Sequence, residues 1–152
     1  MITIKNTQRT VKINLQDIND CVQKVLYRIG YPDFDIGIWF TNNRTIKSYN
    51  ERYRRKNKPT DILSFAYHPN SNPDKKIVTQ TLEDKNLGDI IVSAEYVKKS
   101  AAELKIPFQE HLNTVLIHGV CHLLGYTHDT EKNHARMQAK EKELAKIVSK
   151  LS

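Results

Sequence analysis

Cysteine is scarce in this sequence, which has only Cys21 and Cys121 among its 152 residues. A small secreted domain held by a disulfide framework carries more cysteines than this. We therefore exclude that class and expect two reduced thiols in an intracellular protein. The first residues also lack the apolar stretch of a secretory signal.

Long hydrophobic runs are also missing, and the longest fall far short of the roughly 18 residues that a membrane-spanning helix needs. No internal repeat or low-complexity block occurs. Hydrophobic residues make up 39% and charged residues 27% of the chain, which is typical of a globular protein. We expect a single domain over residues 1–152 that has no membrane partner.

Acidic residues are outnumbered, because 24 lysines and arginines face 17 aspartates and glutamates and give a net charge of +7. This surplus favours an anionic partner, with nucleic acid first. Many basic proteins bind nothing anionic, so the charge alone does not decide the function.

Hydrophobic periodicity predicts an α+β fold. Alternation at Ile2, Ile4, Val11 and Ile13 indicates an opening strand or hairpin. The same segment is also basic, with Lys5, Arg9 and Lys12 and no acidic residue before Asp17. An organelle import signal therefore stays an alternative interpretation of these residues. Further strands are predicted over 34–40, 62–67 and 87–93, and helices over 15–29, from Asn42 or Asn43 to about 54, and over 94–105, 109–124 and 130–150. Residues 68–86 are predicted to form a loop within one compact domain, in which helices surround a mixed sheet of about four strands.

Three histidines within residues 118–128 are the most informative feature. His118 and His122 are four residues apart on a predicted helix, so both side chains lie on one face, one turn apart. Gly125 ends that helix, and His128 then follows in the loop. Three imidazoles with one open position are the composition of a catalytic zinc site. We predict that these histidines bind one metal ion, with zinc favoured, although nickel and copper accept the same ligands.

Two neighbouring residues offer alternatives. Cys121 could bind a soft metal, but a free cysteine is more often a small buried hydrophobic residue. Asp129 could accept a hydrogen bond from a histidine ligand, or it could cap the last helix. Both readings of Asp129 stay open.

One residue argues against a zinc protease. That motif carries a glutamate general base directly after the first helical histidine, and here the position is Gly119. A bound metal can still activate water by lowering its pKa towards ~7.

A basic segment covers residues 52–58, and five of its seven residues are lysine or arginine. Guanidinium groups and lysines bind phosphate oxygens, and Tyr53 within the segment could stack on a base or belong to the core. The alternative without a binding role is a solvent-exposed helix C-terminus, where cations are favoured. Cations beside a metal-activated water would suit hydrolysis of a phosphodiester.

Taken together, these motifs resemble the YbeY endoribonuclease family. The segment from His118 to His128 resembles the family signature. Tyr53-Arg54 with residues 56–65 (KNKPTDILSF) resembles a second motif, and residues 87–90 (LGDI) resemble a third. The chain length matches, and the motifs follow the family order across most of the chain.

The resemblance implies a metal-dependent endoribonuclease that is specific for single-stranded RNA. It implies a role in ribosomal RNA processing at the 3′ end of small-subunit rRNA and in ribosome maturation, with one zinc ion at His118, His122 and His128. Arg54 falls on the functional arginine, for which we expect a catalytic role. We expect Arg54, Arg55, Lys56 and Lys58 to contact RNA. The partners implied are the small ribosomal subunit and one of its proteins.

Thr127 departs from the bacterial pattern, which usually has aspartate before the third histidine. This departure and Cys121 look more like the eukaryotic mitochondrial branch. We therefore expect a cytoplasmic protein if the source is bacterial and a mitochondrial one if it is eukaryotic. The main alternative function is a non-catalytic ribosome-assembly or RNA-binding factor with a structural zinc, and a peptide hydrolase is a weaker one.

Overall fold

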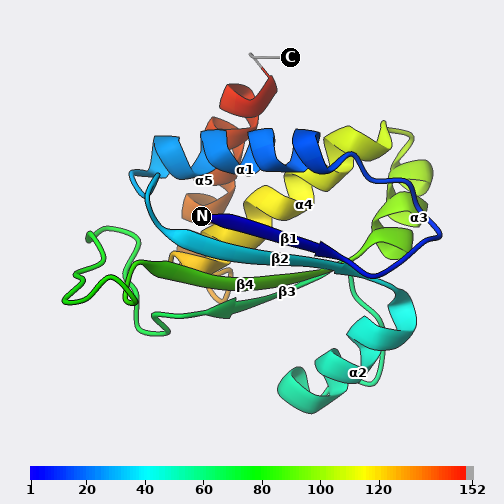
Figure 1. Cartoon of the computed structure of the whole chain (residues 1–152), viewed down its shortest axis with the longest axis horizontal. Coiled ribbons are helices and arrows are strands. Elements are labelled where there is room, and N and C mark those ends of the chain that lie inside the picture. Colours follow the sequence, from blue (N-terminus) through cyan, green and yellow to red (C-terminus); the bar gives the residue numbers. More distant parts are fainter. Residues whose placement is uncertain (150–152) are drawn as a thin grey trace.

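A computed structural model describes residues 1–149 of the chain. It contains four strands: β1 (Ile2–Asn6), β2 (Asp35–Thr41), β3 (Ile62–Ala66) and β4 (Asn86–Ser93). Its helices are α1 (Leu15–Ile29), α2 (Asn43–Arg54), α3 (Ala94–Leu104), α4 (Phe108–Leu123) and α5 (Glu131–Ser149). These elements confirm the predicted α+β class (Figure 1). Residue 150 of the predicted last helix lies outside the described residues.

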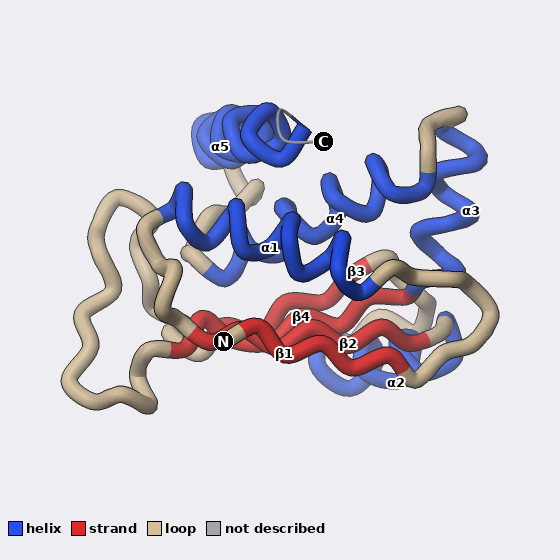
Figure 2. The backbone as a smooth tube through the Cα atoms, turned by 45° about the horizontal axis from the view of Figure 1, so that its top comes forward, coloured by secondary structure: helices blue, strands red, loops and turns tan. Residues whose placement is uncertain are grey.

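The strands form one mixed sheet in the order β1-β2-β4-β3. β1 and β4 both pair parallel with β2, and β3 pairs antiparallel with β4. Strand β3 is therefore an edge strand. Figure 2 shows α1 and α4 over one face of the sheet, with α5 on their outer side, and α2 against one end of the other face.

The core lies between the sheet and helices α1 and α4. Ile36, Ile38 and Phe40 alternate along β2 and are buried towards these helices. Helix α1 brings its apolar stripe onto them, begins after the Asn14 cap and ends at Gly30 with φ 88°. Within residues 1–149, no helix is both long and apolar enough to cross a membrane.

The opening hairpin does not form. Strand β1 ends at Asn6 and pairs with β2, while the Gln8 side chain holds the following turn by bonding the backbone N–H and C=O of Val11. Alternation identified the strand but not its partner, because the partner is distant in sequence.

The long β3–β4 connection (residues 67–85) contains no helix or strand, as predicted. It packs against the turn after α4, and Arg136 of α5 pairs with Asp74 of this loop. The loop therefore closes one side of the region in which the three histidines lie.

Candidate metal centre

Helix α4 presents His118 and His122 on its half-buried side, while Leu112, Leu116 and Val120 face the core. The imidazole Nε2 atoms of the two histidines are 3.0 Å apart. Zinc binds imidazole nitrogen at about 2.0–2.1 Å, so two nitrogens at this separation can bind the same ion. The four-residue spacing therefore places both imidazoles on one face of α4, as the sequence predicted.

Gly125 lets the chain turn back towards α4. Its φ is +98°, and a β-carbon there would lie 2.2 Å from the carbonyl oxygen of Ser71. Only glycine combines this conformation with this contact. The turn places His128 with its ring centroid 5.1 Å from that of His122.

The three histidines fit a single metal ion. One nitrogen from each of His118, His122 and His128 lies within 4.8 Å of the other two. Within residues 1–149, they form the only cluster of histidine, cysteine or acidic side chains with this geometry. Two of the rings are half-buried and His128 is exposed, so the site is open on one side.

Hydrogen bonds leave the facing nitrogens free to bind metal. Nδ1 of His122 lies 3.1 Å from the carbonyl oxygen of Tyr126, which can only accept. Nδ1 therefore carries the proton, and Nε2 offers its lone pair. Burial, and then the neighbouring His118, lower the pKa of His122 to about 4. The ring is neutral at pH 7, which is the form that binds metals.

Glu141 is a site residue that the sequence analysis missed. Its carboxylate oxygen lies 3.3 Å from Nδ1 of His118 and reaches the site from α5. A carboxylate in this position fixes the tautomer and orientation of a histidine ligand and raises its basicity. The available signal was spacing: Glu141 lies four residues after Met137 and three before Leu144, both buried, so a charge occurs on a core-facing stripe.

We predict that Glu141→Ala weakens metal binding by about 10- to 100-fold, the usual cost of losing such a carboxylate. Glu141→Gln retains a hydrogen-bond acceptor without the charge, so its affinity should be intermediate. Competition with a chromophoric chelator measures both. Glu143→Ala is the matched control, because Glu143 pairs with Arg28 and Lys140 instead. Equal affinities for wild type and Glu141→Ala would contradict this role.

The two alternative residues have other roles. Cys121 is fully buried in the core, and burial raises its pKa to about 12, so it is an inert thiol outside the histidine cluster. Asp129 bonds the side chains of Asn133 and Thr127, which lower its pKa. It therefore braces the loop that carries His128, and Thr130 caps α5 by accepting from the backbone N–H of Asn133.

Gly119 allows strand β3 to pack closely on α4. A β-carbon at residue 119 would lie 2.5 Å from Cδ1 of Ile62, and the Ser64 hydroxyl donates to the carbonyl oxygen of Gly119 at 3.2 Å. A larger side chain at this position would displace the side-chain ends of Ile62 and Ser64. The argument against a zinc protease is the absence of the glutamate general base at residue 119.

The close packing of β3 brings part of the basic segment to the histidines. Arg54 is the last residue of α2, and its Nη2 donates to the carbonyl oxygen of Ser64 at 2.8 Å. Its charge contributes to lowering the pKa of His122. Arg54 and Lys56 border a hollow of about 640 Å³ together with the three histidines. We call this the histidine hollow; it is also lined by Ser64, Asp61 and Tyr126.

Arg55 and Lys58 lie outside the lining of the histidine hollow. Arg55 follows α2 as its C-terminal cap in the left-handed conformation, with φ 58°, and its side chain is exposed. The carbonyl oxygen of Lys58 accepts from the Asn50 side chain, and the Lys58 side chain is exposed. The four cations that the sequence grouped together therefore divide into two that border the hollow and two beside it.

The sequence is similar to those of known proteins over almost its whole length. A family model described as "Endoribonuclease YbeY" matches residues 3–149. The human protein of that name is 35% identical over 141 residues, covering 93% of this chain and 84% of the human one. Its namesake from Syntrophotalea carbinolica is 34% identical over 146 residues, covering 95% and 93% of the two chains.

The fold is also similar to that of a solved structure. A solution structure of a protein from Thermotoga maritima superposes with a TM-score of 0.65 and 24% sequence identity. The match covers 97% of this chain and 89% of the other. This similarity supports the fold in which the three histidines of this chain lie close together.

Proposed function

This chain belongs to the YbeY endoribonuclease family, and from that premise we propose that it hydrolyses single-stranded RNA in the histidine hollow, with one metal ion at His118, His122 and His128. The family name and the names of the curated relatives give the activity class, an endoribonuclease. The observation that carries the site assignment is that three imidazoles share one hollow with Arg54 and Lys56.

His118, His122 and His128 would hold the ion through their ring nitrogens. Zinc is the metal that we propose, because three neutral imidazoles and an open position suit it. When bound, such an ion supplies Lewis acidity and lowers the pKa of water towards ~7. Glu141 and the carbonyl oxygen of Tyr126 keep the rings of His118 and His122 in orientation.

Arg54 has the catalytic role in this proposal. Its guanidinium is held by the carbonyl oxygen of Ser64 and lies 5.0 Å from the Phe65 ring centroid. Fixed in this way, it orients a phosphate through charge-assisted hydrogen bonds and stabilises the negative charge that develops during cleavage. Lys56 contributes a second cation at the hollow, and Arg55 and Lys58 contact the RNA backbone beside it.

The physiological substrate that we propose is small-subunit ribosomal RNA near its 3′ end. This rests on the resemblance of the sequence motifs, as do the partners, namely the small ribosomal subunit and one of its proteins. The chain would act where ribosomes mature, in the cytoplasm of a bacterium or in the mitochondrion of a eukaryote. In lysates of the source organism, we expect the tagged protein to co-sediment with small ribosomal subunits. Tagged protein found only in the ribosome-free fractions would contradict these partners.

Cleavage of an end-labelled, single-stranded rRNA fragment tests the proposed function. Wild type should cut the RNA, whereas His118→Ala and a chelator-treated sample should not. Circular dichroism should show that all three stay folded, because His118 and His122 are only half-buried and His128 is exposed. Equal cleavage by the variant would mean contamination, and unfolding on metal removal would favour a structural metal.

We predict that reversing the charges of Arg55 and Lys56 together weakens RNA binding and flattens its salt dependence. Each phosphate contact to a single strand contributes about 0.7 to the slope of log K against log salt. Fluorescence anisotropy at several salt concentrations measures this slope. The matched control is Lys98→Glu with Lys99→Glu, an equal change of charge at exposed residues of α3. Slopes that fall equally in both double variants would place Arg55 and Lys56 away from the RNA.

A further inference from the structure

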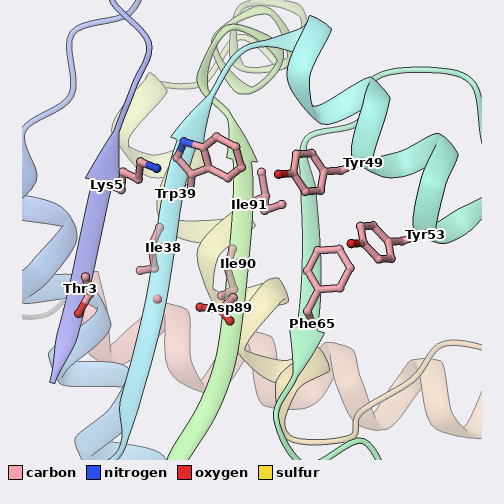
Figure 3. Close-up of a pocket in the computed structure, with 11 residues that line it drawn as sticks. Thr3, Lys5, Ile38, Trp39, Tyr49, Tyr53, Phe65, Asp89, Ile90 and Ile91 are labelled. Carbon is pink, nitrogen blue, oxygen red and sulfur yellow. The ribbon is translucent and has the colours of Figure 1, made fainter.

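The sheet face opposite α1 and α4 (Figure 2) is called the open face here. It carries an aromatic hollow of about 440 Å³. Figure 3 shows the rings of Trp39 and Phe65 over strands β2 and β3, and Tyr49 and Tyr53 reaching towards them from α2. The hydroxyl groups of both tyrosines point over the sheet. None of these four rings contributes to the three-histidine cluster, and Phe65 alone contacts Arg54.

Strand register explains the shape of this hollow. Thr3, Gly37, Asp89 and Phe65 are cross-strand neighbours in one row, and Lys5, Trp39 and Ile91 are neighbours in the next. Gly37 has no side chain, and a β-carbon there would lie 2.3 Å from the carboxylate of Asp89. The floor of the hollow is therefore low at Gly37, and aromatic rings form its walls.

The four rings form a continuous series. The ring centroids of Trp39 and Tyr49 are 5.5 Å apart, those of Tyr49 and Tyr53 are 6.0 Å apart, and those of Tyr53 and Phe65 are 5.3 Å apart. Tyr53 is nevertheless 51% exposed. Trp39, Tyr49 and Phe65 are half-buried and pack partly on a small hydrophobic cluster of Ile46, Leu63 and Ile91. Aromatic side chains that keep an accessible surface on a sheet are a platform on which nucleic-acid bases stack.

Cations lie over these rings. Lys5 Nζ is 5.2 Å from the Trp39 ring centroid, and the guanidinium carbons of Arg52 and Arg54 lie 5.9 Å and 5.0 Å from those of Tyr53 and Phe65. One acid, Asp89, is exposed in the same hollow. Aromatic rings with interleaved cations match a polyanion that carries flat bases, and a lone carboxylate can accept from a base amino group.

Arg54 joins the open face to the histidine hollow. It lies against Phe65 on the open face, donates to Ser64 in the edge strand and borders the histidine hollow. Successive residues of β3 point to opposite faces. A strand of RNA that crosses β3 beside Arg54 would therefore pass from one hollow to the other.

We propose that the open face binds bases of the single-stranded RNA whose phosphodiester lies in the histidine hollow. Tyr53, Phe65 and Trp39 are the stacking groups, and Lys5 and Arg52 attract the backbone. This proposal rests on the proposed function and adds to it a second site, which selects RNA long enough to reach both hollows. It also gives Tyr53 the stacking role that the sequence left open.

Trp39 is the only tryptophan of the chain, so its fluorescence reports on this hollow alone. We expect single-stranded RNA of about 12 nucleotides to quench that fluorescence, whereas RNA of about 3 nucleotides should not, since stacking platforms span about 4–16 nucleotides. The titration uses the full chain with chelator present, which prevents cleavage.

Kinetics of the metal-loaded protein give the second readout. Tyr53→Ala should raise KM for the longer RNA about tenfold, because one base–aromatic stack is worth roughly that factor, and should change the KM for the shorter RNA much less. Tyr53→Phe keeps the ring and should restore the KM. The matched control is Tyr27→Ala, since Tyr27 is an exposed tyrosine of α1, 77% accessible and outside both hollows.

Failure of this proposal is distinguishable from failure of the proposed function. If wild type cleaves RNA while Trp39 fluorescence stays constant and Tyr53→Ala keeps its KM, the open face does not bind RNA, and a protein partner becomes the alternative occupant. If wild type neither binds nor cleaves RNA, the proposed function falls and this proposal falls with it.

Discussion

The His122→Ala protein is expected to be purified without its metal and without RNA cleavage, but folded. His122 supplies the Nε2 atom that lies 3.0 Å from that of His118, and its ring is held by the carbonyl oxygen of Tyr126. Loss of a residue that merely orients a ligand costs about 10- to 100-fold in metal affinity, so loss of a ligand itself should exceed 100-fold. Cleavage should then fall to the level of the metal-free protein.

Elemental analysis and a cleavage assay on the same preparation measure this result. His134→Ala is the matched control: its ring centroid is 6.5 Å from that of His128, yet it lies outside the ligand cluster. His134→Ala should retain both metal and activity. A His122→Ala protein with unchanged metal content would remove His122 from the ligand set, and thermal unfolding measurements would separate this from misfolding.

Much of the site's local geometry could be predicted from the sequence. The spacing of His118 and His122 fixes their common helix face, and the Gly125 turn brings the chain back. Both depend on residues close together in sequence, where local rules are strong. The strand predicted over 34–40 likewise forms as β2, with Ile36, Ile38 and Phe40 buried on one face.

The features that could not be predicted from the sequence depend on contacts between segments that are distant along the chain. Glu141 lies 23 residues after His118 and reaches it only because α5 packs on α4. Gly119 is explained by the packing of β3, which no periodicity specifies. The aromatic hollow depends on strand order as well, since Phe65 lies opposite Asp89 only in the antiparallel β3–β4 pair. Tertiary packing, rather than local pattern, therefore brings the histidines, Arg54 and the open face together.

Arg54→Ala should lower kcat about 100- to 1000-fold while leaving metal content unchanged. Removing one fixed donor that stabilises developing charge has an effect of this size. Arg54 is exposed and contacts none of the three histidines through a hydrogen bond, so the metal centre and fold should persist. The hydrogen bond to Ser64 and the Phe65 ring hold the planar guanidinium in place. Arg54→Lys should therefore recover little, because an ammonium cannot reproduce this fixed fork.

Steady-state kinetics with elemental analysis separate the roles of Arg54. A fall in kcat larger than the rise in KM would indicate that Arg54 acts mainly on the transition state. A rise in KM alone would reduce Arg54 to an RNA-binding residue. Arg44→Ala is the matched control, because Arg44 is an exposed arginine of α2 outside the histidine hollow. Wild-type kinetics for Arg54→Ala would remove the residue from the mechanism and leave Lys56 as the cation at the hollow.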